Sequence, residues 1–187
     1  SSYPASVTAA MVATILAGKA SANAFGQVAG ADVLVIDAGV DADLPPNPRL
    51  IDAKIAKGTN DAAVEPAMTP EQAMSALRRG AQIARQAADD GFDILALGEM
   101  GIGNSASAAL LLHRLGPLPL EHAVGLGAGH SPESLSRKRA AVERAARRTA
   151  ASDPLDVLAQ FGGFEIAMMT GAILGAARTR AVVAIDG

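Results

Sequence analysis

The chain has 187 residues, of which 50% are hydrophobic and 3% aromatic, with a net charge of −3 and no cysteine. The length fits one α/β domain over residues 1–187, and the lack of cysteine excludes disulfides and thiolate catalysis and favours a reducing, cytoplasmic compartment. The acidic balance argues against a nucleic-acid partner, and no apolar run approaches the roughly 20 residues that span a bilayer, so no membrane partner is expected.

Residues 1–30 are expected to form a helical lead-in of two helices, which end near Gly18 and Gly30. The first strand is predicted at 32–37, because an apolar run flanked by aspartates is typical of a strand buried on both faces. A proline-rich loop is expected at 43–48 and a short edge strand at 50–55. An irregular stretch follows through Gly58 and Pro66, before the next helix.

The sequence Thr69-Pro70-Glu71-Gln72 predicts a helix start, because it combines a hydroxyl cap, a proline at the first helical position and a glutamine three residues after the cap. An apolar stripe follows, and Gly91 ends this helix. The stripe consists of Met74, Leu77, Ala81, Ala84 and Ala88.

The second half of the chain continues the alternation of strands and helices. The basic cluster from Arg137 to Arg148 lies on a predicted helix, where it is expected to form a solvated face. The predicted elements are a strand at 92–97, a helix from 105 to 112, a strand end near Val124, helices from Ser131 to about Ala151, from Pro154 to Gly162-Gly163 and over 164–177, and a strand at 181–185.

This alternation predicts a Rossmann-like α/β fold, with right-handed crossovers, a parallel sheet and helices on both faces. In such sheets ligands bind beyond the carboxyl ends of the strands. Three loops are expected to cluster there: Asp37-Ala38-Gly39, Gly98-Glu99 and Asp186-Gly187.

The turn from Leu97 to Ser105 places one carboxylate, Glu99, among three glycines between a predicted strand and a predicted helix. Free backbone N–H groups at such a turn favour a phosphate; a tight turn without a ligand is the alternative. The spacing Gly98-x-x-Gly101-x-Gly103 is neither a dinucleotide fingerprint nor a P-loop, so neither an NAD site nor an ATPase is supported.

The sequence contains no pattern for a metal site or a nucleophilic triad. His113, His122 and His130 are nine and eight residues apart, and no carboxylate stands at ligand spacing from them. No Gly-x-Ser-x-Gly elbow is present. No metal is therefore predicted.

Several segments occur in the order found in one known family, and the Gly-Glu-Met-Gly-Ile-Gly-Asn string is highly specific. On these segments the chain resembles nicotinate-nucleotide–dimethylbenzimidazole phosphoribosyltransferase. The resemblance implies a homodimer without a cofactor that transfers phosphoribose from nicotinate mononucleotide to 5,6-dimethylbenzimidazole, giving α-ribazole 5′-phosphate and nicotinate in cobalamin assembly. The matching segments are Tyr3-Pro4, 8–12, 67–69, 98–104, 156–158, 162–167 and 171–173.

The resemblance also implies roles for individual residues. Glu99 corresponds to an active-site glutamate; capping of a nearby backbone nest is the alternative. Lys138 corresponds to a lysine that approaches the phosphate; a solvent-facing helix lysine is the alternative. Phosphate or ribose contacts are expected from Gly101, Gly103, Asn104 and Ser105 and from a second glycine loop with Gly127 and Gly129, and base contacts from Met100 and Tyr3.

The chain departs from the family pattern in two ways. At four positions the chain has a residue other than the one usual in the family, and these differences bear on which base is accepted and how tightly it binds: Ala10, Ala106, Leu126 and Ala128. In addition, an N-terminal Asp-His-Gly segment and a C-terminal segment with the glutamate usually assigned as the general base are absent, so an incomplete family domain with poor activity of its own is expected. The second hypothesis is a non-catalytic module that binds a nucleotide or a benzimidazole-like ligand through the same loop.

Overall fold

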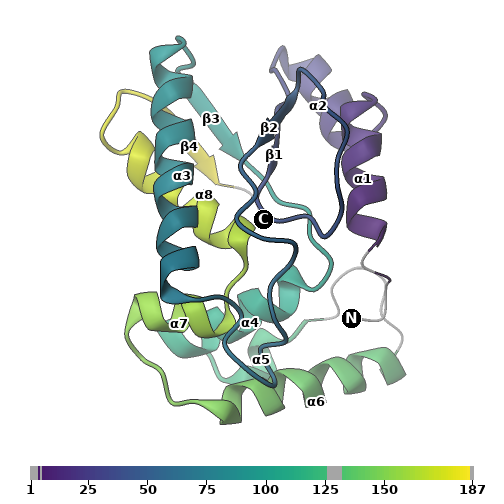
Figure 1. Cartoon of the computed structure of the whole chain (residues 1–187), viewed down its shortest axis with the longest axis vertical. Helices are drawn as coiled ribbons and strands as arrows, with labels where there is room; N and C mark the ends of the chain where they lie inside the picture. Colours follow the sequence, from purple (N-terminus) through teal and green to yellow (C-terminus); the bar gives the residue numbers. More distant parts are fainter. Residues whose placement is uncertain (1–3, 5, 126–131, 186–187) are drawn as a thin grey trace.

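The computed structural model describes residue 4, residues 6–125 and residues 132–185 (Figure 1). Predictions that concern Tyr3, residues 126–131 with Gly127, Gly129 and His130, and Asp186-Gly187 lie outside this part of the chain. The elements are α1 (Ser6–Leu16), α2 (Ser21–Ala29), β1 (Val35–Asp37), β2 (Leu50–Asp52), α3 (Pro70–Asp89), β3 (Ile94–Leu97), α4 (Asn104–Leu115), α5 (Leu120–Ala123), α6 (Pro132–Arg148), α7 (Pro154–Phe161), α8 (Phe164–Ala176) and β4 (Val182–Ile185).

The strands pair in parallel, which confirms the α/β class and the predicted parallel arrangement. Within the described residues they form two pairs, β1–β2 and β3–β4, instead of one hydrogen-bonded sheet. β1 begins at Val35 and not at Asp32, because its pairing with β2 starts at Val35 opposite Leu50. Leu34 is half exposed, so the expected burial of this strand on both faces is not found.

Helices α3 and α8 cover one face of the β3–β4 pair. Leu95 and Leu97 pack there with a small cluster of buried alanines from the two helices. On the other face the side chains of Ile94 and Val182 are 65% and 61% exposed. The sequence predicts helices on both faces of the sheet. Within the described residues, helices cover only one face of the β3–β4 pair.

The start of α3 confirms the predicted capping box. The Thr69 hydroxyl accepts a hydrogen bond from the Gln72 amide at 3.1 Å, and the Gln72 side chain accepts one from the Thr69 amide at 2.9 Å. Two backbone donors at the helix start are thus satisfied by side chains, with Pro70 at the first helical position.

The buried stripe of α3 is rotated from the predicted one, because α8 packs on its glycine and alanine residues. Leu77 and Ala84 are buried as predicted, whereas Met74, Ala81 and Ala88 are only partly buried. The residues that complete the stripe are Ala73, Ala76 and Gly80. Small residues on both helices allow their backbones to approach closely.

One prediction for the second half of the chain is wrong, and a second holds for only part of its residues. Val124 does not end a strand: it follows the one-turn helix α5, and its buried side chain joins the cluster between α4 and α6. The solvated face predicted for the basic cluster is found at Arg137, Arg139, Arg144 and Arg147, which are exposed. It is not found at Arg148, whose guanidinium donates to the carbonyls of Ala62 and Gln160. Helix α6 also ends at Arg148, a few residues earlier than expected.

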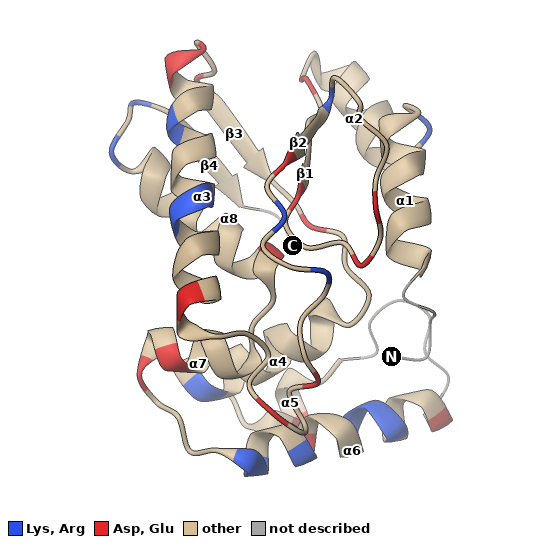
Figure 2. Ribbon diagram, in the orientation of Figure 1, with Lys and Arg blue, Asp and Glu red and all other residues tan. Residues whose placement is uncertain are grey.

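Acidic and basic residues are both spread along the ribbon, and on α3 the acidic positions lie toward the two ends with the basic ones between them (Figure 2). Among the described residues, no helix combines the length and the apolar character required to cross a membrane.

Candidate functional site

The glycine turn lies where the sequence places it, between the end of β3 and the start of α4. Gly103 is the N-cap residue of α4 and has φ +101° and ψ −15°. A residue with a Cβ atom rarely adopts this conformation, so glycine is required here by the backbone itself. The turn therefore leads directly into a helix N-terminus, which is a favourable position for an anion.

Some backbone donors of the turn are already used within the chain. The amide of Ile102 donates to the hydroxyl of Thr8 on α1 at 3.2 Å, and the amide of Asn104 donates to the Gly101 carbonyl at 3.3 Å. No hydrogen bond joins the amides of Gly101 and Gly103 to another described residue. The expectation of free N–H groups is therefore wrong for Ile102 and Asn104 and holds for Gly101 and Gly103 among the described residues.

Glu99 is oriented by the side chain of Asn104. The Asn104 amide group donates to the Glu99 carboxylate, and its oxygen accepts the Ser105 amide at 2.5 Å. Glu99 itself is exposed. Its partner is thus a side-chain amide at the first position of α4, so the structure offers no backbone nest that Glu99 caps in this part of the chain.

Lys138 reaches the same turn from α6. Its ammonium group donates to the Ser105 hydroxyl at 2.9 Å and to the Gly125 carbonyl at 3.0 Å. Partial burial lowers the pKa of Lys138 below its usual value. The neighbouring Arg137 and Arg139 are exposed. Lys138 therefore differs from an ordinary solvent-facing helix lysine and brings a cation to the N-terminus of α4.

Helix α8 supplies a second carboxylate, which was not singled out from the sequence. A Cβ atom on Gly101 would lie 4.0 Å from the carboxyl carbon and from Oε1 of Glu165, so this carboxylate faces the turn. Burial raises the pKa of Glu165; a hydrogen bond from its own backbone amide opposes this effect, and the charge of Glu99 adds to it.

The signal that could have identified Glu165 is its place in the sequence. A carboxylate follows Gly162-Gly163-Phe164 at a predicted helix start, within a segment that matches the family. The loop after β1 reaches the same helix end, because a Cβ atom on Gly39 would overlap the ring of Phe164. The loops that follow β1 and β3 therefore meet at the N-terminus of α8, as expected for the carboxyl ends of parallel strands.

The remaining predicted site residues are placed only in part. Met100 is half-buried within the turn. Tyr3, Gly127 and Gly129 lie outside the described residues. In the part of the chain that the structure describes, no group of three or more histidine, aspartate or glutamate side chains could hold a metal ion.

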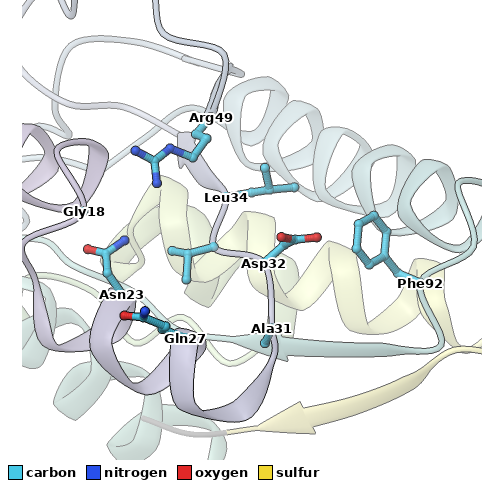
Figure 3. A pocket seen from close by; sticks show the side chains of 9 residues that line it. Gly18, Asn23, Gln27, Ala31, Asp32, Leu34, Arg49 and Phe92 are labelled. Carbon is cyan, nitrogen blue, oxygen red and sulfur yellow. The ribbon is translucent and has the colours of Figure 1, made fainter.

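A cavity of about 380 Å³ lies elsewhere, between α2 and the segments that lead into the strands (Figure 3). Asp32, Arg49 and Phe92 line it, and each stands just before β1, β2 or β3. Asn23 and Gln27 of α2 complete its polar lining. The cavity is therefore at the amino ends of the strands, opposite the edge where ligands of parallel sheets bind.

Together these features define an α/β protein with parallel strands and a candidate ligand site at a strand-turn-helix junction, where two carboxylates and a lysine lie. A family model described as phosphoribosyltransferase matches residues 1–187. The chain belongs to this phosphoribosyltransferase family.

Curated relatives match the whole chain. The nicotinate-nucleotide–dimethylbenzimidazole phosphoribosyltransferase of Cupriavidus necator is 50% identical, covering 100% of this chain and 54% of the relative. The enzyme of the same name from Roseiflexus sp. is 45% identical with the same coverage. The crystal structure of CobT from Thermus thermophilus superposes with a TM-score of 0.93 at 42% identity, covering 100% of this chain and 56% of that one. The chain thus spans about half the length of the curated relatives it matches.

Proposed function

We propose that this chain carries the nucleotide-binding turn for transfer of phosphoribose from nicotinate mononucleotide to 5,6-dimethylbenzimidazole, which yields α-ribazole 5′-phosphate and nicotinate for the nucleotide loop of cobalamin. The names of the curated relatives support these substrates. The observation that carries the proposal is the meeting of Glu99, Asn104, Ser105 and Lys138 at the start of α4.

The proposed reaction requires a base and no acid. The leaving pyridine is a cation in the mononucleotide and departs as a neutral ring, so it needs no proton. The incoming benzimidazole loses its N–H proton when its other nitrogen forms the bond to C1′ of the ribose, and a carboxylate is suited to accept that proton. We assign this role to the glutamate of the family's C-terminal segment named above, and we propose that Glu99, which Asn104 holds in place and solvent can reach, lies beside the reacting bases.

The phosphate of the mononucleotide requires fixed donors and a positive charge. The amides of Gly101 and Gly103, which bond to no other described residue, would supply the donors together with the N-terminus of α4, and the ammonium group of Lys138 would supply the charge. Ser105 and Asn104 are proposed to contact phosphate or ribose, and the soft side chain of Met100 is proposed to line the base. Contacts from Tyr3, Gly127 and Gly129 remain part of the proposal.

The proposal includes the assembly and the setting of the enzyme. A homodimer, a cytoplasmic location and small-molecule substrates as the partners are proposed from the family resemblance. The chain spans about half of its relatives, and we propose that the 187 residues alone bind substrates better than they turn them over. Binding without turnover, even when the missing half of a relative is supplied in trans, would favour the alternative of a non-catalytic binding module.

Calorimetry with each substrate separately tests the proposal. Nicotinate mononucleotide should bind the wild-type chain, and Lys138→Ala should weaken this binding about tenfold or more, as expected for loss of a charge-assisted contact. Arg137→Ala is the matched control, because it removes an exposed cation one residue away on the same helix. Glu99→Gln should weaken binding of dimethylbenzimidazole and leave the mononucleotide affinity nearly unchanged. Equal affinities for the mononucleotide in Lys138→Ala and Arg137→Ala would refute the phosphate role of Lys138.

A further inference from the structure

The two strand pairs lie on the same two helices. In the β1–β2 pair, Ile51 packs against a cluster to which both α3 and α8 contribute, including Leu77. In the β3–β4 pair, Leu95 packs against Ala84 of α3 and Ala172 of α8. One helical layer therefore supports both pairs, although no hydrogen-bonded ladder joins one pair to the other among the described residues.

The neighbouring strands of the two pairs are β1 and β3. At their amino ends, Asp32 and Phe92 line the same cavity and point toward each other (Figure 3). At their carboxyl ends, Cβ atoms placed on Gly39 and Gly101 would lie within 4.0 Å of side chains at the first two positions of α8. The gap between the pairs is therefore bounded by β1 on one side and by β3, running in the same direction, on the other.

The backbone groups on this side of β1 and β3 have no strand partner. Val35 donates to the segment that leads into β2, and Asp93, just before β3, accepts from β4. Consecutive residues of an extended strand direct their N–H and C=O groups to opposite edges, so those of Ile36, Ile94 and Ala96 point into the gap. No hydrogen bond joins these three amides to another described residue.

Apolar side chains border the gap and are exposed. Leu34 and Ile36 lie along β1, and Ile94 lies on β3. In a parallel sheet such side chains are normally covered, because both faces of the sheet are buried. An open strand edge with apolar side chains beside it is a ready site for the addition of another strand.

The order of the strands indicates which strand fits. β1 and β2 follow one another outward on one side of the gap, and β3 and β4 do so on the other. In a doubly wound sheet with the order 3-2-1-4-5, the first strand lies at the centre and later strands are added outward on each side. The gap has the place of that first strand, and α1 and α2 have the place of the crossover that leads from it to β1.

We propose that the gap between β1 and β3 binds one parallel strand, apolar on both faces, from the family segment that precedes the region matched by this chain. This strand pairs with β1 at one edge and with β3 at the other, and it joins the two pairs into one sheet. The relatives have the length for it, since the chain covers 54% of the Cupriavidus necator protein.

The position of this strand also bears on the candidate site. The loop that follows it opens between the Gly39 loop and the Glu99 turn, which is the point where the strand order reverses and where ligands of such sheets bind. The strand therefore completes the ligand-binding edge as well as the sheet. The proposal depends on the two open edges and on family membership, and not on the substrates proposed above.

Amide hydrogen exchange followed by NMR tests the docking of the strand. The chain is compared with an extended chain, in which the residues that precede the matched region of the Cupriavidus necator relative are joined to its N-terminus, so that the strand is present at high effective concentration. Exchange of the Ile36, Ile94 and Ala96 amides should slow by about a hundredfold or more. Val183 is the control, because its amide faces the outer edge of β4 and should exchange equally fast in both proteins.

Two outcomes of this comparison would contradict the proposal. Slower exchange at Val183 alone would mean that the segment adds to the outer edge of β4, and unchanged exchange at all four amides would mean that it does not dock on the strands. Protection of the three amides in the unextended chain that disappears on dilution would mean that a second copy of the chain fills the gap, which also overturns the proposal.

Ile94→Lys separates docking from a general stabilisation by the added residues. Because Ile94 is 65% exposed, the substitution should change the Tm of the unextended chain by less than about 2 °C. In the extended chain it should lower the Tm by about 5 °C or more and restore fast exchange at Ile36, since a charge would be buried beside the docked strand. Val64→Lys, at a 73% exposed position whose neighbours Ala62 and Ala63 pack against the α4–α6 cluster, should affect both proteins equally. Equal Tm changes for Ile94→Lys in the two proteins would refute the docking of a strand at β3.

Discussion

The ammonium group of Lys138 donates to the hydroxyl of Ser105 at 2.9 Å, which joins the middle of α6 to the first turn of α4. The contact brings a side chain from another element, 33 residues further along the chain, to the turn that contains Glu99. A cation placed at a helix N-terminus is unfavourable by itself, because the helix end is already positive. An anion bound between them would be stabilised by both, so the arrangement is suited to a phosphate group.

The lowered pKa of Lys138 predicts how phosphate binding depends on pH. Lys138 loses its proton at a lower pH than an exposed lysine does, because burial disfavours its charged form. Above a pH of about 7.5 the phosphate is fully ionised, since its second pKa is about 6. The affinity for nicotinate mononucleotide should therefore fall as the pH rises through the lowered pKa of Lys138. Calorimetry at increasing pH measures this loss.

Lys138→Arg provides the comparison, because a guanidinium stays protonated throughout this range. The variant should show an affinity that is nearly independent of alkaline pH. Arg137→Lys is the control for adding or removing a titrating lysine on α6, and it should retain the wild-type profile. A decline of equal steepness in wild type and Lys138→Arg would show that another group causes it.

Replacement of Gly103 by alanine should destabilise the protein by about 1–2 kcal/mol, the usual cost of a side chain in the left-handed region. Apart from its chain neighbours, no heavy atom of the described residues lies within 4 Å of the position a Cβ atom would take, so the expected cost comes from strain of the backbone. Urea denaturation followed by circular dichroism measures the change. The strained N-cap should also weaken mononucleotide binding, since Gly103 leads into α4.

Gly98 offers a matched control in the same loop. A Cβ atom at Gly98 would also lie in open space, but its φ is not in the positive range. Gly98→Ala should therefore change the free energy of unfolding by less than about 0.5 kcal/mol. Similar losses in Gly98→Ala and Gly103→Ala would mean that the positive φ of Gly103 is not what makes it necessary.

The sequence predicts those parts of the fold that depend on neighbouring residues. The capping box of Thr69 and Gln72 and the helix break at Gly162-Gly163 are local signals, and both are confirmed. The extent of β1 and the helical end at Val124 depend on which distant segment is paired or packed there. No local pattern contains that information, so these two predictions fail.

The candidate site divides in the same way. The turn with Glu99, Gly103 and Asn104 is contiguous, so its residue types and spacing reveal it. Lys138 stands out from its basic neighbours only through the family resemblance, and the structure then brings it to Ser105. Glu165 is marked in the sequence only by its place after Gly162-Gly163 at a predicted helix start, and its approach to the turn follows from the packing of α8, which no local pattern contains.

The loop that follows β1 should depend on the ion pair between Asp37 and Lys54. Their charged atoms are 2.7 Å apart, and the Asp37 side chain is only 3% exposed. Lys54 also donates to the carbonyls of Val40 and Ala42. Lys54→Met should destabilise the protein by about 3 kcal/mol, because it leaves a buried carboxylate without its cation. Asp37→Asn should cost less, since Lys54 keeps its carbonyl partners.

A double-mutant cycle in urea denaturation measures the coupling, and the double variant should lose less than the sum of the two single variants. The pair Lys57–Asp43 is the matched control, because its charged atoms are also 2.7 Å apart but both side chains are largely exposed. Lys57→Met should have no measurable effect, as is usual for a surface ion pair. Strict additivity for Asp37 and Lys54 would contradict a direct interaction.

Gly171→Ala should destabilise the contact between α3 and α8 by about 3 kcal/mol, although alanine normally favours a helix over glycine by about 1 kcal/mol. A Cβ atom at Gly171 would overlap the backbone of Leu77, including its carbonyl oxygen. Because backbone atoms of a helix cannot turn aside as a flexible side chain does, the two helices would have to move apart. Thr170→Ala is the neighbouring control on the exposed side of α8, and it should be neutral or slightly stabilising. Adding Leu77→Ala should not restore the stability lost in Gly171→Ala, because the overlap is with the main chain of Leu77. If the double variant is as stable as Leu77→Ala alone, a side-chain contact requires glycine at position 171, and not the close approach of the two backbones.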